Sequence, residues 1–296
     1  MNDKSTSLID IGVNLSAPRL ARQADLVIER AARANVRGMI LTGTSPEASV
    51  ICADYARDLS DPSRCLMWST AGVHPHDSAA ALERGEGWIT TIEELLTRPE
   101  VVAVGECGLD FERDYSPRPA QLEVFEAQLQ LAVRYQRPLF LHQRGAHDPF
   151  CELLSRYAPD LPKCGDGLAA IVHCFTGDRA ELDRYLKLGC HIGVTGWVCD
   201  ERRGQALQEA VPSLPLNRVH VETDAPYLTP RTLRPRPKKG INEPAFLPHI
   251  VGELARYMET EPELLTERAT QNTCALFGIT LDALTELTAT PAEPNR

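Results

Sequence analysis

Val101-Val102-Ala103-Val104-Gly105-Glu106 is the stretch that decides the fold, because a short β-branched run ends on a residue able to bind a metal. The same pattern recurs in Pro138–His142, Ala169–His173 and Val219–Asp224. Runs of this length and composition are typical of buried parallel strands. We therefore expect four strands that end on the metal-binding residue types Glu106, His142, His173 and Asp224.

Strand-like and helix-like segments alternate along the rest of the chain. Four further strands are predicted at 8–13, 38–43, 67–73 and 191–197. Helical segments are predicted near 18–35, 46–59, 86–98, 118–135, 148–157, 179–188 and 202–211. Such alternation predicts an α/β protein with a parallel sheet. Eight units over roughly 250 residues favour a TIM-like (β/α)8 barrel over an open doubly wound sheet.

The domain organisation follows from the same alternation. No linker interrupts it, so we predict a single domain over residues 1–296, with the barrel from about 7 to 280. The tail from about 286 to 296 is rich in Pro, Thr and Ala, and we expect it to be disordered.

Composition and charge limit the class of protein. With 43% hydrophobic and 24% charged residues the chain is typical of soluble globular proteins. It has neither a membrane-span-length apolar run nor a signal peptide, so we expect no membrane partner. Nine cysteines without a C-x-x-C pair indicate reduced thiols and a cytoplasmic location. Nothing indicates an extended apolar interface, so we expect a monomer.

The net charge of −10 argues against a general nucleic-acid binder, but basic residues gather locally. Arg144, Arg202, Arg203 and the segment 231–239 all follow predicted strands. If they lie on one face, they form a positive rim that attracts a phosphate-bearing substrate. The alternative for 231–239 is a solvated loop without a partner.

Convergence of the strand ends predicts a metal site. In a parallel barrel the C-terminal ends of all strands meet at one face. Two imidazoles and two carboxylates arriving there are a suitable ligand set for a divalent metal. His74, at the end of the 67–73 strand, is a ligand, a phosphate donor or a turn residue, and we favour phosphate contact. The sequence therefore predicts a metal-dependent hydrolase.

Several longer motifs resemble the TatD family of metal-dependent deoxyribonucleases, over residues 8 to 279. These are Asp10–Asn14, Ala71–His76, Val104–Asp110, Leu141–Arg144, Val172–Gly177, Gly193–Asp200, Glu222–Leu228 and Asn242–Pro244. Within the family the likeness is greatest to bacterial 3′–5′ exonucleases of single-stranded DNA and RNA. The resemblance implies a TIM-like barrel, a single-stranded DNA or RNA substrate and a role in DNA repair or nucleic-acid turnover. It also implies a divalent metal held by Glu106, His142, His173 and Asp224.

One departure from the broader family concerns a second metal. Many members carry a His-x-His pair on the first strand, where this chain has Gly12 and Asn14. Glycine has no ligand atom, and Asn14 offers only a neutral carbonyl oxygen. The bacterial exonuclease branch shares this change. Ligand softness favours Mn²⁺ or Zn²⁺, whereas the resemblance favours Mg²⁺. We expect Mg²⁺, with Mn²⁺ as a substitute.

The chemistry of phosphodiester cleavage suggests a role for each residue. Glu106, His142 and His173 would hold the main metal. Asp224 would either bind the metal or orient the attacking water and accept its proton. Arg144 and His74 would contact the non-bridging phosphate oxygens as charge-assisted donors.

Two other functions compete with a nuclease. One is an amidase-type hydrolase of the same superfamily, such as an aminoacyl-tRNA deacylase. It is disfavoured because the His-x-His pair is missing and no lysine lies at a strand end. The other is a non-catalytic metal-dependent binding protein, which the four retained ligand-type residues disfavour. Aromatic residues near the predicted face either stack on unpaired bases or pack, namely Phe111, Tyr115, Trp197 and Tyr227.

Overall fold

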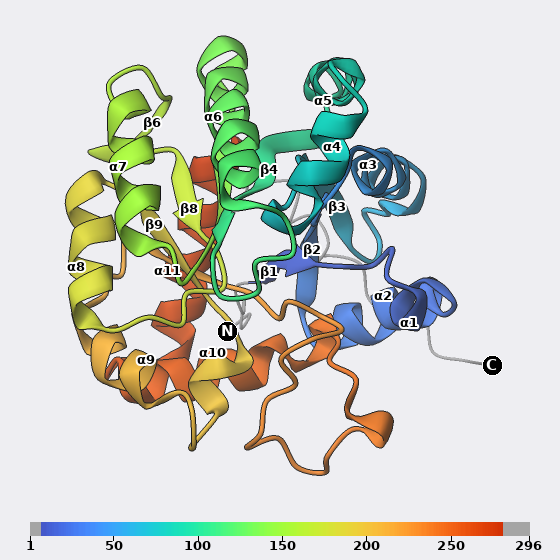
Figure 1. Cartoon of the computed structure of the whole chain (residues 1–296). Coiled ribbons are helices and arrows are strands. Elements are labelled where there is room, and N and C mark those ends of the chain that lie inside the picture. Colours follow the sequence, from blue (N-terminus) through green and yellow to red (C-terminus); the bar gives the residue numbers. More distant parts are fainter. Residues whose placement is uncertain (1–6, 281–296) are drawn as a thin grey trace.

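Eight parallel strands form the centre of the molecule (Figure 1). The computed structural model describes residues 7–280, so the tail predicted at 286–296 lies outside the described residues. The strands are β1 Leu8–Val13, β2 Val36–Leu41, β3 Leu66–Ala71, β4 Val101–Asp110, β5 Leu139–Arg144, β8 Ala170–Val172, β9 His191–Val194 and β10 Val219–Val221. They are hydrogen-bonded in that order, and each pair of neighbours is parallel.

The first and last strands of this sheet meet, which closes the barrel. Val13 and Ala225 form a parallel bridge, and the Asn14 N–H donates to the Ala225 carbonyl at 2.8 Å. The buried carboxylate of Asp10 accepts from the N–H and the hydroxyl of Thr223, at 2.9 and 2.6 Å. The TIM-like (β/α)8 barrel predicted from the sequence is thereby confirmed.

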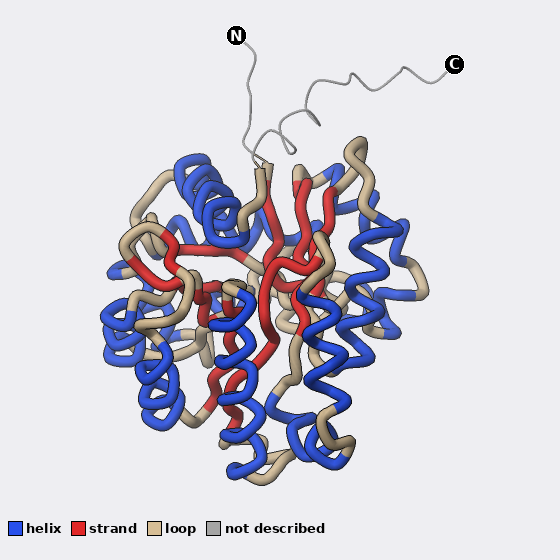
Figure 2. The backbone as a smooth tube through the Cα atoms, turned by 90° about the horizontal axis from the view of Figure 1, so that it is seen from above, coloured by secondary structure: helices blue, strands red, loops and turns tan. Residues whose placement is uncertain are grey.

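Helices surround the strands (Figure 2). They are α1 Pro18–Ala21, α2 Ala24–Arg33, α3 Pro46–Leu59, α4 Ser78–Glu83, α5 Gly87–Leu96, α6 Arg118–Tyr135, α7 His147–Tyr157, α8 Arg179–Leu188, α9 Gln205–Ala210, α10 Leu247–Tyr257 and α11 Pro262–Phe277. A hairpin of β6 Lys163–Cys164 and β7 Gly167–Leu168 precedes β8. The helix predicted at 18–35 is broken in two, because Gln23 leaves the helical backbone region at φ −141°. No helix within residues 7–280 is long and apolar enough to cross a membrane.

The end of the barrel opposite the strand C-termini is closed by α11. Thr270 donates to the carbonyl of Ser7, before β1, and Asn272 donates to the carbonyl of Val219, where β10 begins. Leu276 and Phe277 belong to the same buried cluster as the strand residues Ile9, Ile11, Ile40, Phe140 and Ile171. Each such buried side chain contributes roughly 1.5–3 kcal/mol. The interior of the barrel is therefore a packed core. It supports the face at which the C-terminal ends of the strands meet.

The strand that carries Glu106 runs four residues beyond the predicted end, to Asp110. Between the pairs Val104–Leu139 and Cys107–Leu141, β4 advances three residues while β5 advances two, so β4 carries a bulge. Gly105, at φ +142°, permits it, because a Cβ there would lie 2.2 Å from the Phe140 carbonyl oxygen. Glu106 therefore lies on a bulge within the strand, a feature that commonly redirects a functional side chain.

Candidate metal centre

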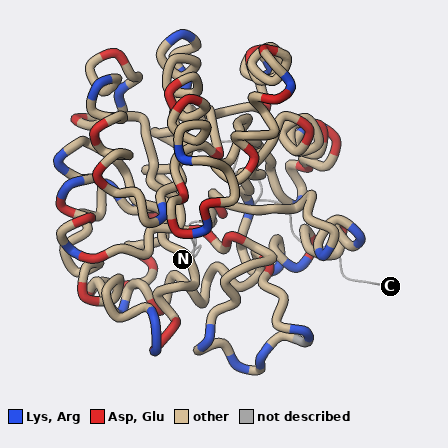
Figure 3. The backbone as a smooth tube through the Cα atoms, in the orientation of Figure 1, with Lys and Arg blue, Asp and Glu red and all other residues tan. Residues whose placement is uncertain are grey.

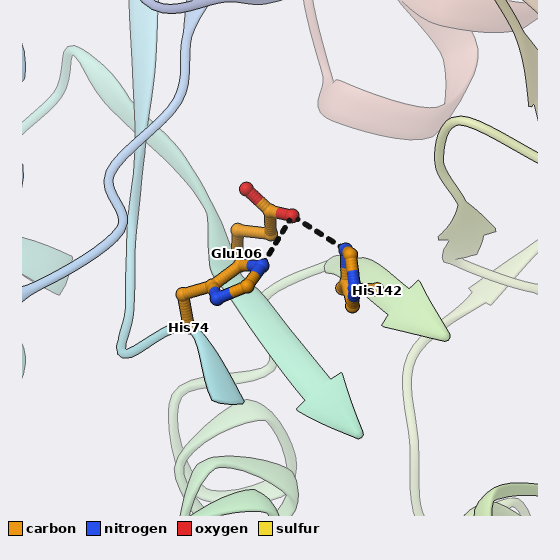
Figure 4. A group of neighbouring side chains, drawn as sticks. All are labelled: His74, Glu106 and His142. Carbon is orange, nitrogen blue, oxygen red and sulfur yellow. Dashed lines mark hydrogen bonds and ion pairs between the residues drawn. The ribbon is translucent and has the colours of Figure 1, made fainter. Parts of the chain in front are cut away.

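The carboxylate of Glu106 is the centre of a cluster of imidazoles. Its Oε1 lies 2.8 Å from Nε2 of His173, 2.9 Å from Nδ1 of His142 and 3.4 Å from Nε2 of His74. His74 and His142 approach that oxygen from two sides (Figure 4). Glu106 is only 6% exposed, so these contacts are shielded from bulk water.

The strand ends bring these residues together. Glu106 and His142 lie on the neighbouring strands β4 and β5, and His173 directly follows β8. Asp224 comes three residues after the end of β10. A cavity of about 770 Å³ opens at this face. All six residues singled out in the sequence line it, namely His74, Glu106, His142, Arg144, His173 and Asp224.

His173 lies between two buried carboxylates. Its Nε2 faces Glu106, and its Nδ1 lies 3.2 Å from Oε2 of Glu222. Burial favours the neutral ring, but the two carboxylates outweigh burial and hold the pKa of His173 well above its usual value. A histidine that donates Nδ1–H to a carboxylate and presents Nε2 to a shared centre is the usual arrangement of a metal-binding imidazole. His173 fits a metal in this way once Nε2 is deprotonated.

His142 approaches Oε1 of Glu106 with its Nδ1, whereas His173 approaches the same oxygen with its Nε2. The buried Nε2 of His142 has no hydrogen-bond partner and lies 3.7 Å from Oδ2 of Asp110. Burial lowers the pKa of His142, but the carboxylates of Asp110 and Glu106 more than compensate and raise it. Two imidazole nitrogens and one carboxylate oxygen thus meet within hydrogen-bond distance. This donor set fits a divalent transition metal or Mg²⁺ with added waters.

His74 is better placed to donate a proton than to bind a metal. Its ligand atom lies within 4.8 Å of those of Glu106 and His142. However, its Nδ1 accepts the backbone N–H of His76 at 3.1 Å. The hydrogen-bond network thus assigns the proton of the neutral ring to Nε2. Burial lowers the pKa of His74, which keeps the ring neutral. Its Nε2–H therefore faces Oε1 of Glu106, which also lines the cavity, as a donor.

Asp224 has the properties of a proton acceptor near neutral pH. Burial, with the nearby carboxylates of Glu106 and Glu222, raises the pKa of Asp224 to about 7, although His173 opposes this. The amide of Asn14 donates to its Oδ1 at 3.0 Å and fixes the carboxyl group. Asn14, considered from sequence only as a weak ligand, thus orients Asp224. A carboxyl group with this pKa can accept a proton from water.

Sequence reasoning missed Glu222, whose carboxylate is fully buried beside the site. It accepts from Nδ1 of His173 and from the N–H of Cys174, at 3.2 and 2.5 Å. A Cβ on Gly12 would lie 2.3 Å from Oε2 of Glu222, and one on Gly193 would lie 2.5 Å from Oε1. The two glycines therefore make room for this carboxylate. Its position two residues before Asp224, in the run 219–224 that the sequence predicts as a strand, was the available signal.

Part of the predicted positive rim is paired with carboxylates. Arg144 contacts Glu112 at 3.1 Å, Arg203 contacts Asp200 at 2.9 Å, and Arg231 contacts Glu201 at 3.0 Å. In the loop after β10, residues 225–242 carry Lys and Arg but no acidic residue (Figure 3). Because Arg144 and its partner are exposed, their ion pair is weak, and Arg144 can exchange that partner for a phosphate.

Comparison with known proteins gives one consistent family. The pattern that defines the TatD related DNases matches residues 9–278. A "3'-5' ssDNA/RNA exonuclease TatD" from Enterobacter lignolyticus is 46% identical over 274 residues, covering 93% of this chain and all of the relative. A protein of the same name from Klebsiella pneumoniae is 45% identical over 282 residues, covering 94% of this chain and all of the relative.

Solved structures have the same architecture. A TatD homologue from Escherichia coli K12 superposes with a TM-score of 0.79 at 26% identity, covering 92% of this chain and 98% of the homologue. An uncharacterized amidohydrolase from Saccharomyces cerevisiae has a TM-score of 0.79 at 22% identity, covering 92% and 100%, and supports the fold alone.

Proposed function

Because the chain belongs to the TatD family of DNases, we propose that it is a metal-dependent phosphodiesterase that removes nucleotides from the 3′ end of single-stranded DNA and RNA. Relatives named as such exonucleases, 45–46% identical over almost the whole chain, support a nuclease. The single structural observation that carries the proposal is the meeting of His142 and His173 at one oxygen of the buried Glu106.

Glu106, His142 and His173 are the residues we assign to the metal, which we propose is Mg²⁺, with Mn²⁺ or Zn²⁺ able to replace it. A divalent cation bound there polarises a phosphoryl oxygen and lowers the pKa of water. Glu222 holds the Nδ1 proton of His173 and so directs Nε2 into the site. Protein side chains contact the substrate and accept the proton of the attacking water.

Three side chains around the cavity act on the substrate and the nucleophile. His74 donates its Nε2–H to a non-bridging phosphate oxygen, and Arg144 contributes positive charge at the rim. Asp224, held by Asn14, orients the attacking water and accepts its proton. All three side chains line the same cavity, which supports these proposed roles.

We further propose a cytoplasmic monomer that works in DNA repair or nucleic-acid turnover. All nine cysteines are free, and seven of them are buried, which suits a reducing compartment. Size-exclusion chromatography with light scattering tests the monomeric state, because the measured mass of a dimer would be twice 32.7 kDa.

The defining experiment uses a single-stranded oligonucleotide labelled at either end, with Mg²⁺ or with EDTA. We expect a 5′ label to give a descending ladder and a 3′ label to be released at once as mononucleotide, both only with Mg²⁺. Glu106→Gln should reduce the rate by more than about a hundredfold, since loss of an outer-shell partner alone costs 10- to 100-fold. Glu263→Gln, exposed on α11, is the matched control and should leave the rate unchanged.

Other outcomes of the assay separate the alternatives. Immediate release of a 5′ label would reverse the proposed polarity, and equal rates with EDTA would exclude the metal. An intact oligonucleotide together with amino acid released from aminoacyl-tRNA would favour the deacylase. No turnover of either substrate would favour a binding protein.

A further inference from the structure

The aromatic residues at the open face fall into two groups. The ring of Phe111 is covered by the guanidinium of Arg118 at 4.6 Å, and that of Trp197 by Arg203 at 4.4 Å. Both rings are partly buried and pack against the core. An arginine thus covers one face of each ring, and both rings are less exposed than the two tyrosines of the second group.

The second group consists of Tyr115 and Tyr227, which are 66% and 54% exposed. Both line the metal cavity. Among the large hydrophobic side chains exposed within residues 7–280, the other four lie outside the lining of this cavity: Leu26, Val50, Ile51 and Leu264. Exposed aromatic surface is thus concentrated where the substrate would enter.

The two tyrosines stand on opposite sides of the barrel mouth. Tyr115 belongs to the loop after β4, and Tyr227 to the loop after β10. In the closed order of eight strands, β4 and β10 are four places apart, which is half of the circumference. Both rings therefore line the cavity from loops that follow strands on opposite sides of the barrel.

The backbone that carries Tyr227 is fixed although its side chain is exposed. Its N–H donates to the Asp224 carbonyl at 2.9 Å. The amide of Asn242, which is completely buried, donates to the carbonyls of Tyr227 and Thr223 at 2.7 and 2.9 Å. The ring is thus attached to a rigid support next to the proposed catalytic carboxyl group.

The loop that carries Tyr115 is fixed in a similar way. Asp110 accepts the backbone N–H of Arg113 at 2.9 Å, and the buried hydroxyl of Ser116 donates to the carbonyl of His76 at 2.7 Å. The ring of His76 lies against that of Tyr115 with 4.6 Å between centroids. A rigid attachment reduces the entropy lost when a ligand is bound.

We propose that Tyr115 and Tyr227 stack on unpaired bases of the nucleic-acid strand, one on each side of the metal site. This proposal rests on the proposed function and names how that site selects its substrate. Every base offers a π-face, so stacking tolerates any sequence. A base inside a duplex is stacked on its neighbours, which makes single strands the substrate class that these rings recognise.

Equilibrium binding of single-stranded oligonucleotides tests the proposal under conditions in which the metal-dependent cleavage is blocked. Fluorescence anisotropy in EDTA compares a labelled oligothymidylate with an abasic strand of the same length and phosphate charge. Tyr115→Leu and Tyr227→Leu should each weaken binding of oligothymidylate by about fivefold or more. The matched variants Tyr115→Phe and Tyr227→Phe keep the ring and should bind within twofold of the wild type. Affinity for the abasic strand should be unchanged in all four variants.

The outcomes distinguish stacking from the nuclease proposal. Leucine variants that bind oligothymidylate as tightly as the wild type would overturn stacking, as would an equal loss for the abasic strand. In either case cleavage by the wild type would leave the nuclease intact. If the leucine variants bind oligothymidylate more weakly, as expected, but the wild type never cuts oligonucleotides, stacking would be supported and the nuclease function contradicted.

Discussion

Gly12→Ala should weaken metal binding indirectly, by displacing the carboxylate of Glu222, which orients the metal-binding His173. The new Cβ would lie 2.3 Å from Oε2 of Glu222 and 3.4 Å from its Cδ. The carboxylate must therefore move and weaken its hydrogen bond with Nδ1 of His173. If Glu222 moves away from Gly12, it also disturbs the hydrogen bond that its Oε1 accepts from the N–H of Cys174 at 2.5 Å.

Two magnitudes follow from this geometry. Overpacking a buried site costs about 1–3 kcal/mol of unfolding free energy. For a chain of this size each kcal/mol corresponds to roughly 2–4 °C, so the midpoint of thermal unfolding should fall by roughly 2–12 °C. Loss of the carboxylate that orients a metal-binding histidine costs about 10- to 100-fold in metal affinity.

Thermal unfolding in EDTA and calorimetric titration with Mn²⁺ measure the two effects separately. Gly252→Ala in α10 is the matched control, because nothing lies within 4 Å of its added Cβ. It should stabilise the protein by up to about 1 kcal/mol. In the double variant Gly12→Ala with Glu222→Asp, the shorter side chain should recover part of the lost stability. A Gly12→Ala protein with an unchanged midpoint and Mn²⁺ affinity would refute the reasoning.

Four further outcomes are expected. Burial lowers the pKa of His191 to about 4, and that of His220 to well below 6.5, so the unfolded chain binds more protons below pH 6.5. The contribution of these two histidines to the unfolding free energy in urea should therefore be full above pH 6.5 and fall, by up to about 1.4 kcal/mol per histidine and pH unit, toward pH 4. The raised pKa of Asp224 acts in the opposite direction over this range, and that of His173 does so above about pH 6.5. NMR titration of either His191 or His220 centred near 6.5 would contradict the assignment. Asp224→Asn should lower kcat by about 10²–10⁴-fold while the protein folds and binds Mn²⁺, and near wild-type turnover would exclude the proposed base. Asn242→Ala should cost about 1–3 kcal/mol in urea unfolding, because two loop carbonyls lose their donor. Mn²⁺ at a hundred times its Kd should raise the unfolding free energy by about 2.7 kcal/mol, and Glu106→Gln should abolish that increase.

The barrel and the convergence of ligand-type residues were predictable from local pattern. β-branched runs such as Val101–Val104 indicate buried strands, and alternation with helices implies parallel order. Parallel order places every strand end at one face, so Glu106, His142 and His173 had to approach one another. The same logic did not assign α10 and α11, because they follow the last strand and no further strand marks their ends.

What only the tertiary structure decided depends on contacts between distant segments. The bulge that places Glu106 within β4 depends on how closely Gly105 approaches Phe140 of the next strand. The room for Glu222 comes from glycines on two other strands. Four aromatic residues looked equivalent in sequence, and which of them stay exposed was settled by arginines that cover two of the rings. Local periodicity determines which face a side chain occupies, whereas its neighbours across the barrel determine what it can touch.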